Sequence, residues 1–281
     1  MTLRSRGGRT WGRRVDVTLA VVLLALLVLA AVLAPIIAPY DPTDQDLLHR
    51  LEGPGAAHWL GTDESGRDVL SRLLYGTRVS LGASLLAVAV AVTCGVPSGV
   101  VAGYLGRGFD LVVSRVADAA LSIPGLVLAI AIATALGPSL TNAMIAVGLV
   151  YAPGFYRVAR GATIAVRGRT YVEAAITTGC STPRIIVRHV LPNVRTPLVV
   201  KTFLTFGYAI LAEASLSFLG IGVQPPEASW GSMLKRAVRH LEQAPLLVIL
   251  PGLVILAAVL AFNTIGDGLR DTRAHREREP S

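Results

Sequence analysis

The chain has 281 residues, of which 53% are hydrophobic and only 16% are charged, and its mean hydropathy is +0.60. This composition excludes an ordinary soluble protein. The net charge of +8 does not indicate a nucleic-acid partner, because the basic residues lie in short segments between long apolar runs. We therefore expect an integral membrane protein.

Six apolar runs predict an all-α bundle of six transmembrane helices. The expected spans are residues 17–36, 80–104, 111–136, 141–158, 194–220 and 245–266. Each is close to the roughly 20 residues that a helix needs to cross a bilayer. The first run is longer than the roughly 7 to 15 residues of a signal-peptide core and has no small-residue cleavage site before Pro35, so we expect it to be retained.

The distribution of Lys and Arg predicts the orientation. With six spans both termini lie on one side, and that side carries 17 basic residues in its loops and tails, against 7 on the other. Because loops rich in Lys and Arg stay on the cytoplasmic side of a membrane, we expect cytoplasmic tails at residues 1–16 and 271–281. Two cysteines are too few for a disulfide framework.

An external segment follows the first span, so that residues 17–79 form the first region of the chain. Thr62 or Asp63 is expected to cap a helix that continues through the apolar residues Val69 and Leu73 and lies along the membrane surface. The charged side chains of this stretch are expected to form its solvated face. The candidate residues are Gly61, Thr62, Asp63, Gly66, Arg67 and Asp68.

Residues 80–270 are expected to form the transmembrane core. Gly95 in the second span and Pro124 in the third are expected to interrupt their helices, which is tolerable only in a multi-helix bundle. Arg115 and Asp118 are three residues apart on one helix, so we expect them to pair and to lower the cost of each charge.

The cytoplasmic segment, residues 157–193, predicts two short helices. In the first, Thr170 and Glu173 have the spacing of a capping box. Gly179 can adopt the left-handed conformation that ends this helix. From these features alone, Glu173 capping its own helix in an ordinary connector is as good an interpretation as a functional loop.

The second short helix is expected to begin after the hydroxyl of Ser181 and to end at Leu191 and Pro192. In the first helix, Ala174 and Ala175 present almost no side chain. Small residues of this kind allow the backbone of another protein to approach closely.

This segment resembles the EAA loop of ABC importer permeases. The matching residues are Glu173, Ala174, Ala175, Gly179, Leu191 and Pro192. The sequence departs from the common pattern at His189, where the family often has Ile, but the run from Arg188 to Pro192 resembles the variant of peptide-type permeases. In that family the loop docks on a cytoplasmic ATPase, and the resemblance implies that role for Arg188, His189 and their neighbours.

The external string from His58 to Leu81 resembles that of the dipeptide, oligopeptide and nickel subclass of these permeases, and the likeness extends over residues 11–272. It implies a type I ABC importer architecture with six transmembrane helices. It also implies several partners: a second homologous permease, two ATPase subunits that bind ATP and Mg, an external substrate-binding protein and membrane lipid. Ala228 stands where relatives commonly have proline.

This chain has no Gly-x-x-x-x-Gly-Lys-Ser/Thr loop for binding the phosphates of ATP. We therefore expect that it is not an enzyme and that it binds no cofactor itself. Its five histidines are scattered and none lies in a predicted span, which argues against a metal site. ATP would then be hydrolysed by separate subunits.

Glu213 lies within the fifth span, where an ionised carboxylate is costly without water, a partner helix or a proton. Two interpretations stay open. Glu213 and Ser217, one helical turn apart, could line the translocation path and meet the ammonium group of a substrate. Alternatively, Glu213 could form a hydrogen bond between two permease subunits.

The expected function is that of a permease subunit for short peptides. Nickel is the nearest alternative substrate, because relatives that carry it share the same external string. An ion-coupled secondary transporter would favour two repeated halves, which the sequence does not show. An intramembrane enzyme would need a catalytic motif such as His-Glu-x-x-His or Gly-x-Ser-x-Gly, and the sequence has neither.

Overall fold

The computed structural model describes the backbone of residues 6–276 and the side chains of residues 15–271. This part of the chain is helical and has no β-strand beyond a single bridge between Thr62 and Asp68. The α-helices are α1 (Arg6–Ile37), α2 (Val69–Leu105), α3 (Arg107–Ser122), α4 (Gly125–Leu136), α5 (Leu140–Arg167), α6 (Thr170–Thr177), α7 (Thr182–Ile185), α8 (Leu191–Leu219), α9 (Trp230–Ala237) and α10 (Leu246–Arg276). The all-α prediction is confirmed. The outermost parts of the predicted tails, residues 1–5 and 277–281, lie outside the described residues.

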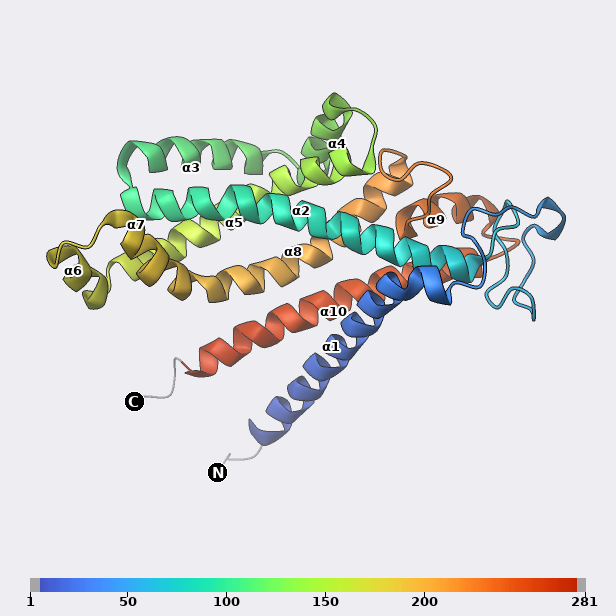
Figure 1. Cartoon of the computed structure of the whole chain (residues 1–281), viewed down its shortest axis with the longest axis horizontal. Coiled ribbons are helices and arrows are strands. Elements are labelled where there is room, and N and C mark those ends of the chain that lie inside the picture. Colours follow the sequence, from blue (N-terminus) through green and yellow to red (C-terminus); the bar gives the residue numbers. More distant parts are fainter. Residues whose placement is uncertain (1–5, 277–281) are drawn as a thin grey trace.

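α2, α5 and α8 run along the long axis of the molecule, and α10 and α1 are inclined to it (Figure 1). α5 and α8 pack beside α2, and α1 packs against α10. α6 and α7 lie at one end of this bundle, which we call the α6 end. α9 and the segment 38–68 lie at the opposite end, which we call the α9 end.

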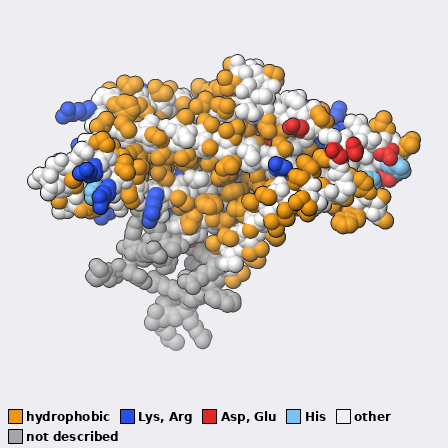
Figure 2. All heavy atoms as spheres, viewed as in Figure 1, with side chains coloured by type: hydrophobic (Ala, Val, Ile, Leu, Met, Phe, Trp, Pro, Cys, Tyr) orange, Lys and Arg blue, Asp and Glu red, His pale blue; other side chains and the backbone are white. Residues whose placement is uncertain are grey.

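The surface between the two ends is predominantly apolar (Figure 2). On the face shown, the Asp and Glu side chains gather toward the α9 end and most Lys and Arg side chains toward the α6 end. An apolar band with charged groups at both ends is the arrangement that a membrane-spanning bundle requires.

Four stretches are long and apolar enough to cross a membrane. They are Val15–Ile37, Val69–Leu105, Thr182–Leu219 and Leu246–Asp271. α3 and α4 qualify only as a pair, bent by 100°. α5 has 28 residues but is not among them, since polar residues such as Asn142 and Arg157 dilute its hydrophobic ones. Five of the predicted spans each fall in one helix and the third is divided between α3 and α4, so a count of six crossings is not confirmed.

The third span breaks where the sequence predicts. Ile123, between α3 and α4, is extended with φ −94° and ψ 136°, because the proline that follows it disfavours the helical conformation. The second span does not break, since α2 continues through Gly95 for 37 residues in all. That prediction is wrong, and the glycines of α2 serve close packing instead.

Gly95, Gly99 and Gly103 recur every fourth residue of α2 and therefore lie on one face, which packs against α5. A Cβ atom at Gly99 would lie 2.5 Å from the carbonyl oxygen of Tyr156, and one at Gly103 would lie 2.7 Å from that of Arg160. No side chain fits between these backbones. Small residues at this spacing are a common means of close approach between membrane helices.

Gly99→Ala should therefore force α2 away from α5 and lower the free energy of unfolding by about 1–3 kcal/mol, the usual cost of overpacking. Gly82→Ala is a matched control on the same helix, because a Cβ atom there meets nothing within 4 Å. Thermal unfolding in detergent measures both variants. Equal midpoints would contradict the close packing of the two backbones.

Candidate functional site

The α6–α7 segment, residues 168–192, forms the first half of the candidate site. α6 begins at Thr170 after Arg169, and no side chain caps it. The predicted capping box is therefore wrong, because Thr170 is already the first helical residue, and Glu173 is exposed. Gly179 has φ +79°, which confirms the predicted left-handed residue after this helix.

The second helix begins after Ser181, as predicted, although the Ser181 hydroxyl makes no capping hydrogen bond. The predicted end at Leu191 and Pro192 is wrong. α7 continues through a π-helical turn, Ile186–Val190, directly into α8. Pro192 stands in the first turn of α8, where a missing N–H is tolerated. α7 is thus continuous with a long membrane helix.

One side of the α6–α7 segment is buried against the ends of α2 and α5. The buried cluster comprises Val172, Ala175, Ile185, Val190 and Val194 with Val100, Tyr104 and Ala159. The guanidinium of Arg167 adds a cation–π contact, 5.6 Å from the centre of the Tyr104 ring. Because packed interiors are nearly incompressible, a force on this segment reaches α2, α5 and α8 together.

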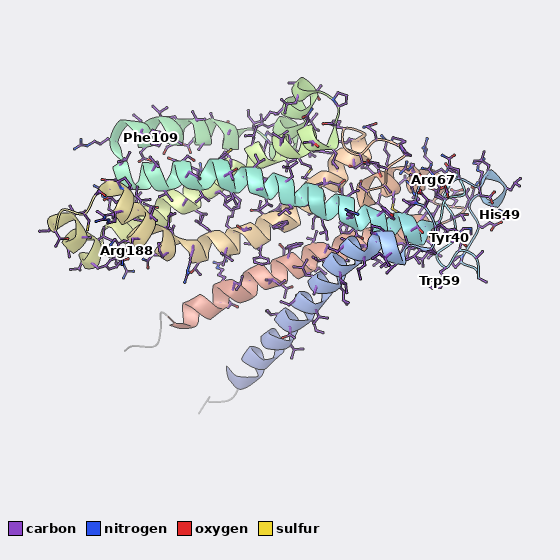
Figure 3. All side chains as sticks on the ribbon, in the orientation of Figure 1. Tyr40, His49, Trp59, Arg67, Phe109 and Arg188 are labelled. Carbon is purple, nitrogen blue, oxygen red and sulfur yellow. The ribbon has the colours of Figure 1, made fainter. Side chains whose placement is uncertain are left out.

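The other side of the segment is open. Its exposed candidates are Glu173, Ala174, Gly179, Arg188, Leu191 and Pro192. Figure 3 shows Arg188 at this end of the molecule. Ala175 is buried, and His189 is half-buried with its ring 6.2 Å from that of Tyr171, so these two candidates support the segment from within. The exposed apolar side chains of Ile176 and Val187 add to a surface that suits a protein partner.

An ion pair ties α3 to α5. The Arg160 guanidinium donates to both carboxylate oxygens of Asp110, and Arg160 Nη2 lies 2.6 Å from Oδ2. The Tyr156 hydroxyl donates to Oδ1 of the same carboxylate at 3.1 Å. This bidentate geometry fixes both side chains. Sequence reasoning missed the pair, because its members are 50 residues apart and only the packing of α3 on α5 brings them together.

The predicted pairing of Arg115 with Asp118 is wrong. Asp118 instead accepts a hydrogen bond from Arg157 Nη2 of α5 at 2.6 Å. Helical spacing places Arg115 and Asp118 on one face, but the neighbouring helix offers a cation with better geometry. Both partners of the observed pair are more than half exposed, so it contributes little to stability.

At the α9 end the charged candidates form a buried ion cluster, so the predicted solvated face is wrong. Asp63 Oδ2 lies 3.3 Å from Arg67 Nε and 3.2 Å from Arg72 Nε, and none of these three side chains is more than 9% exposed. Glu64 lies 3.5 Å from Arg236 of α9. Burial lowers the pKa of Arg236, and the Glu64 carboxylate opposes that shift. The cluster fastens residues 38–68, which we call the outer segment, to α2 and α9.

Asp68 caps the helix at this end, in place of the predicted Thr62 or Asp63. Asp68 Oδ2 accepts from the backbone N–H of Ser71 at 2.8 Å, and its Oδ1 lies 3.0 Å from Nδ1 of His58. One carboxylate thus ends the outer segment and starts α2.

No separate interfacial helix precedes the second span within the described residues, contrary to the prediction. α2 begins at Val69 and runs without interruption into the membrane stretch. Gly61 and Gly66, before it, have φ values of +80° and +74°, which are incompatible with a helix. A Cβ atom at either glycine would collide with the backbone of the segment 46–53, so both are needed for the fold of the outer segment.

The outer segment ends in an exposed tip. Figure 3 labels Tyr40, His49 and Trp59 at this end of the molecule, and Trp59 is 70% exposed. The His49 ring lies 2.7 Å from the Asp46 carboxylate, and this hydrogen bond raises the pKa of His49 and lowers that of Asp46. The tip combines aromatic and charged groups on the side opposite the α6–α7 segment.

Glu213 and Ser217 lie inside the chain, with side chains 0% and 1% exposed. The Glu213 carboxylate accepts hydrogen bonds from Ser80 of α2 at 2.9 Å and from Ser217 at 2.7 Å. Both side chains are enclosed within this chain, and the hydrogen bond between Glu213 and Ser80 joins α8 to α2.

Two further features bear on ligands. Among the described residues, no group of three or more His, Cys, Asp and Glu side chains is placed to hold a metal ion. A groove of about 510 Å³ has an almost wholly apolar lining, which suits a lipid chain or another membrane helix better than a polar solute. Its lining residues are Val21, Leu24, Ala25, Val28, Leu29, Val32, Phe203 and Ile265.

Known families match most of the chain. The family described as binding-protein-dependent transport system inner membrane component matches residues 95–278, which include the α6–α7 segment. The chain belongs to this family. A second family, the N-terminal transmembrane domain of oligopeptide transport permease C, matches residues 18–54 of the permease, the first span and part of the outer segment.

Individual relatives agree. The permease is 46% identical over 223 residues to the dipeptide transport system permease protein DppC of Alkalihalophilus pseudofirmus, covering 79% of this chain and 73% of that relative. It is 44% identical over 260 residues to the probable D,D-dipeptide transport system permease protein DdpC of Escherichia coli, covering 92% and 87%.

A solved structure shows the same fold. An inward-facing structure of the MetNI methionine ABC transporter superposes with a TM-score of 0.57 at 20% identity, over 73% of this chain and 95% of that chain. The predicted type I ABC importer permease fold is confirmed.

Proposed function

We propose that this permease is one of two homologous membrane subunits of an ATP-driven importer of short peptides. The α6–α7 segment docks on one of two cytoplasmic ATPase subunits, which bind ATP and Mg. The α9 end faces an external substrate-binding protein. The observation that carries the proposal is the α6–α7 segment, which has an exposed outer side and an inner side packed on α2 and α5.

The charge distribution supports a cytoplasmic α6 end. The basic residues in the loops, in the tails and at the ends of the predicted spans divide 17 to 7 between the two sides, and the 17 lie on the side of the α6–α7 segment. α1 begins and α10 ends toward that same side (Figure 1). Both termini would then be cytoplasmic.

Exposed apolar faces support a second membrane subunit. On α3, Phe109, Leu111, Val112 and Val116 are exposed although the helix lies along the bundle. Lipid or a homologous chain must cover such a face. A passage for a polar solute needs a second wall, which the homologous chain would supply.

The names of the relatives support peptides as the solute. Besides the two dipeptide permeases, the glutathione transport system permease protein GsiD of Pectobacterium atrosepticum is 42% identical over 234 residues. All three named solutes are small molecules with ionised ends and one or two amide groups. The proposal extends that solute class to this chain.

Uptake into proteoliposomes tests the proposal. The permease is purified with its associated chains, reconstituted, and supplied with labelled dipeptides, tripeptides or nickel, and each component is omitted in turn. We expect ATP-dependent uptake of peptide that needs two ATPase copies, a second permease and an external binding protein. Uptake of nickel alone would refute the peptide assignment, and uptake without any ATPase would refute the importer.

A further inference from the structure

The buried Glu213 carboxylate occupies a defined hydrogen-bonding position near the α9 end of α8. Its Oε2 accepts from Ser80 Oγ of α2 and its Oε1 accepts from Ser217 Oγ, at 2.9 and 2.7 Å. The Ser229 hydroxyl is a third neighbour of this carboxylate. Each of the two closer hydroxyls donates its single proton to the carboxylate.

Each of these hydroxyls also accepts a backbone N–H. Trp230 N donates to Ser80 Oγ at 3.2 Å, and Val223 N donates to Ser217 Oγ at 3.3 Å. Because the carboxylate takes the hydroxyl protons, it orients an oxygen lone pair of each serine toward a backbone amide. Glu213 therefore acts at two backbone positions that it does not touch.

The two amides belong to the two stems of one outer loop, residues 220–230, which runs from the end of α8 to the first residue of α9. Val223 in the first stem and Ser229 and Trp230 in the second are buried, whereas the tip, residues 224–227, is exposed. The Trp230 indole Nε1 adds a hydrogen bond to Thr77 of α2 at 3.3 Å. Both stems are thus held at the base and the tip projects.

Close steric contacts keep the stems in place. A Cβ atom at Gly231 would lie 2.5 Å from the carbonyl oxygen of Ala214, and one at Gly76 would lie 3.3 Å from the Trp230 ring. The second stem therefore rests directly on the backbones of α8 and α2. Glu213 sits where these three elements meet.

α8 links this network to the opposite end of the molecule. It is continuous with α7, and the whole stretch Thr182–Leu219 is a single candidate membrane span of 38 residues. From Leu191 to Glu213 the helix rises about 33 Å at 1.5 Å per residue. A displacement of the α6–α7 segment can therefore be carried along α8 to the outer loop.

We propose that Glu213 is a positioning residue that clamps both stems of the outer loop 220–230 to α8 and α2, so that the loop moves with α8. This inference rests on the proposed function for the source of the movement, the ATPase cycle. Glu213 acts through Ser80 and Ser217 and contacts no solute.

Hydrogen–deuterium exchange across residues 220–231 of the assembled complex tests the clamp. Ser80→Ala should speed exchange of the Trp230 amide and Ser217→Ala that of the Val223 amide, each roughly tenfold for one lost hydrogen bond. Glu213→Met should speed both. Thr205→Val is the matched control, because the Thr205 hydroxyl of α8 is also buried but donates only to the carbonyl of Lys201.

Two exchange results would overturn the clamp. One is wild-type protection of both amides in Glu213→Met. The other is an equal increase in the exchange rates of both amides in each serine variant. That result would show general destabilisation and not a separate hydrogen bond for each stem. Neither result depends on transport.

Transport then tests the coupling of the loop to α8. The complex with Glu213→Met should retain ATP hydrolysis, but its rate of uptake should fall at least tenfold. Adding nucleotide should change the exchange rates of the two amides in the wild type and not in this variant. Wild-type uptake with two loosened stems would overturn the coupling. If the wild-type complex itself transported no solute, the proposed function would fail while the exchange pattern still decided the clamp.

Discussion

Replacing Asp63 by alanine is expected to destabilise the outer part of the permease by about 3–5 kcal/mol, the usual effect of removing one partner from a buried ion cluster. Asp63 Oδ2 lies within 3.3 Å of Nε atoms of both Arg67 and Arg72. Its Oδ1 also accepts from the backbone N–H groups of Ser65 and Arg67. Without it, two guanidinium groups stay buried with no carboxylate between them.

The midpoint of thermal unfolding in detergent measures this effect. Asp41→Ala is the control, since the Asp41 carboxylate is exposed and accepts only from its near neighbour Thr43 in the same outer segment. We expect a large decrease for Asp63→Ala and almost none for Asp41→Ala. Equal midpoints would show that the cluster is solvated after all, as the sequence suggests.

Replacing Ala174 by arginine is expected to abolish most ATP-dependent uptake without preventing insertion of the chain. Ala174 lies on the exposed side of α6, whereas the packing of the segment on α2 and α5 depends on Val172 and Ala175. A long charged side chain at the centre of a docked interface costs about 2 kcal/mol or more. That cost corresponds to roughly a thirtyfold loss in binding of the ATPase subunit.

Uptake, ATP hydrolysis and the amount of co-purified ATPase are measured together for this variant. Ala56→Arg places the same side chain on an exposed position at the opposite end of the molecule and should leave the amount of co-purified ATPase unchanged. Normal uptake by Ala174→Arg would refute docking through α6. Loss of the permease from the membrane would instead show that α6 serves folding.

The sequence predicted the helical architecture because long apolar runs leave a membrane chain few alternatives. It also predicted the break at Pro124 and the left-handed Gly179, since both follow from the local chemistry of a single residue. The predicted ends at Thr170 and Pro192 are wrong. α6 begins at Thr170 without a side-chain cap, and α7 continues through the π-helical turn into α8, so these local signals did not define either boundary.

The polar contacts could not be predicted in the same way. Asp110 with Arg160 and Glu213 with Ser80 join residues 50 and 133 positions apart, and no local spacing marks either pair. Asp63 shows the converse error, because its charged neighbours suggest solvent exposure while the structure buries them. For the candidate site, the exposed side of the α6–α7 segment was recognisable by resemblance. The buried contacts of this segment with α2 and α5 were not recognisable from the sequence.

Photo-crosslinking from position 174 tests the central claim most directly. A photoreactive residue is introduced at Ala174, and at buried Ala175 and outer Ala56 as controls, and the irradiated membranes are analysed by mass spectrometry. We expect a crosslink from position 174 alone to an ATP-hydrolysing subunit, at a yield that changes with nucleotide. Capture of no such subunit from position 174, in membranes that still take up substrate, would contradict it.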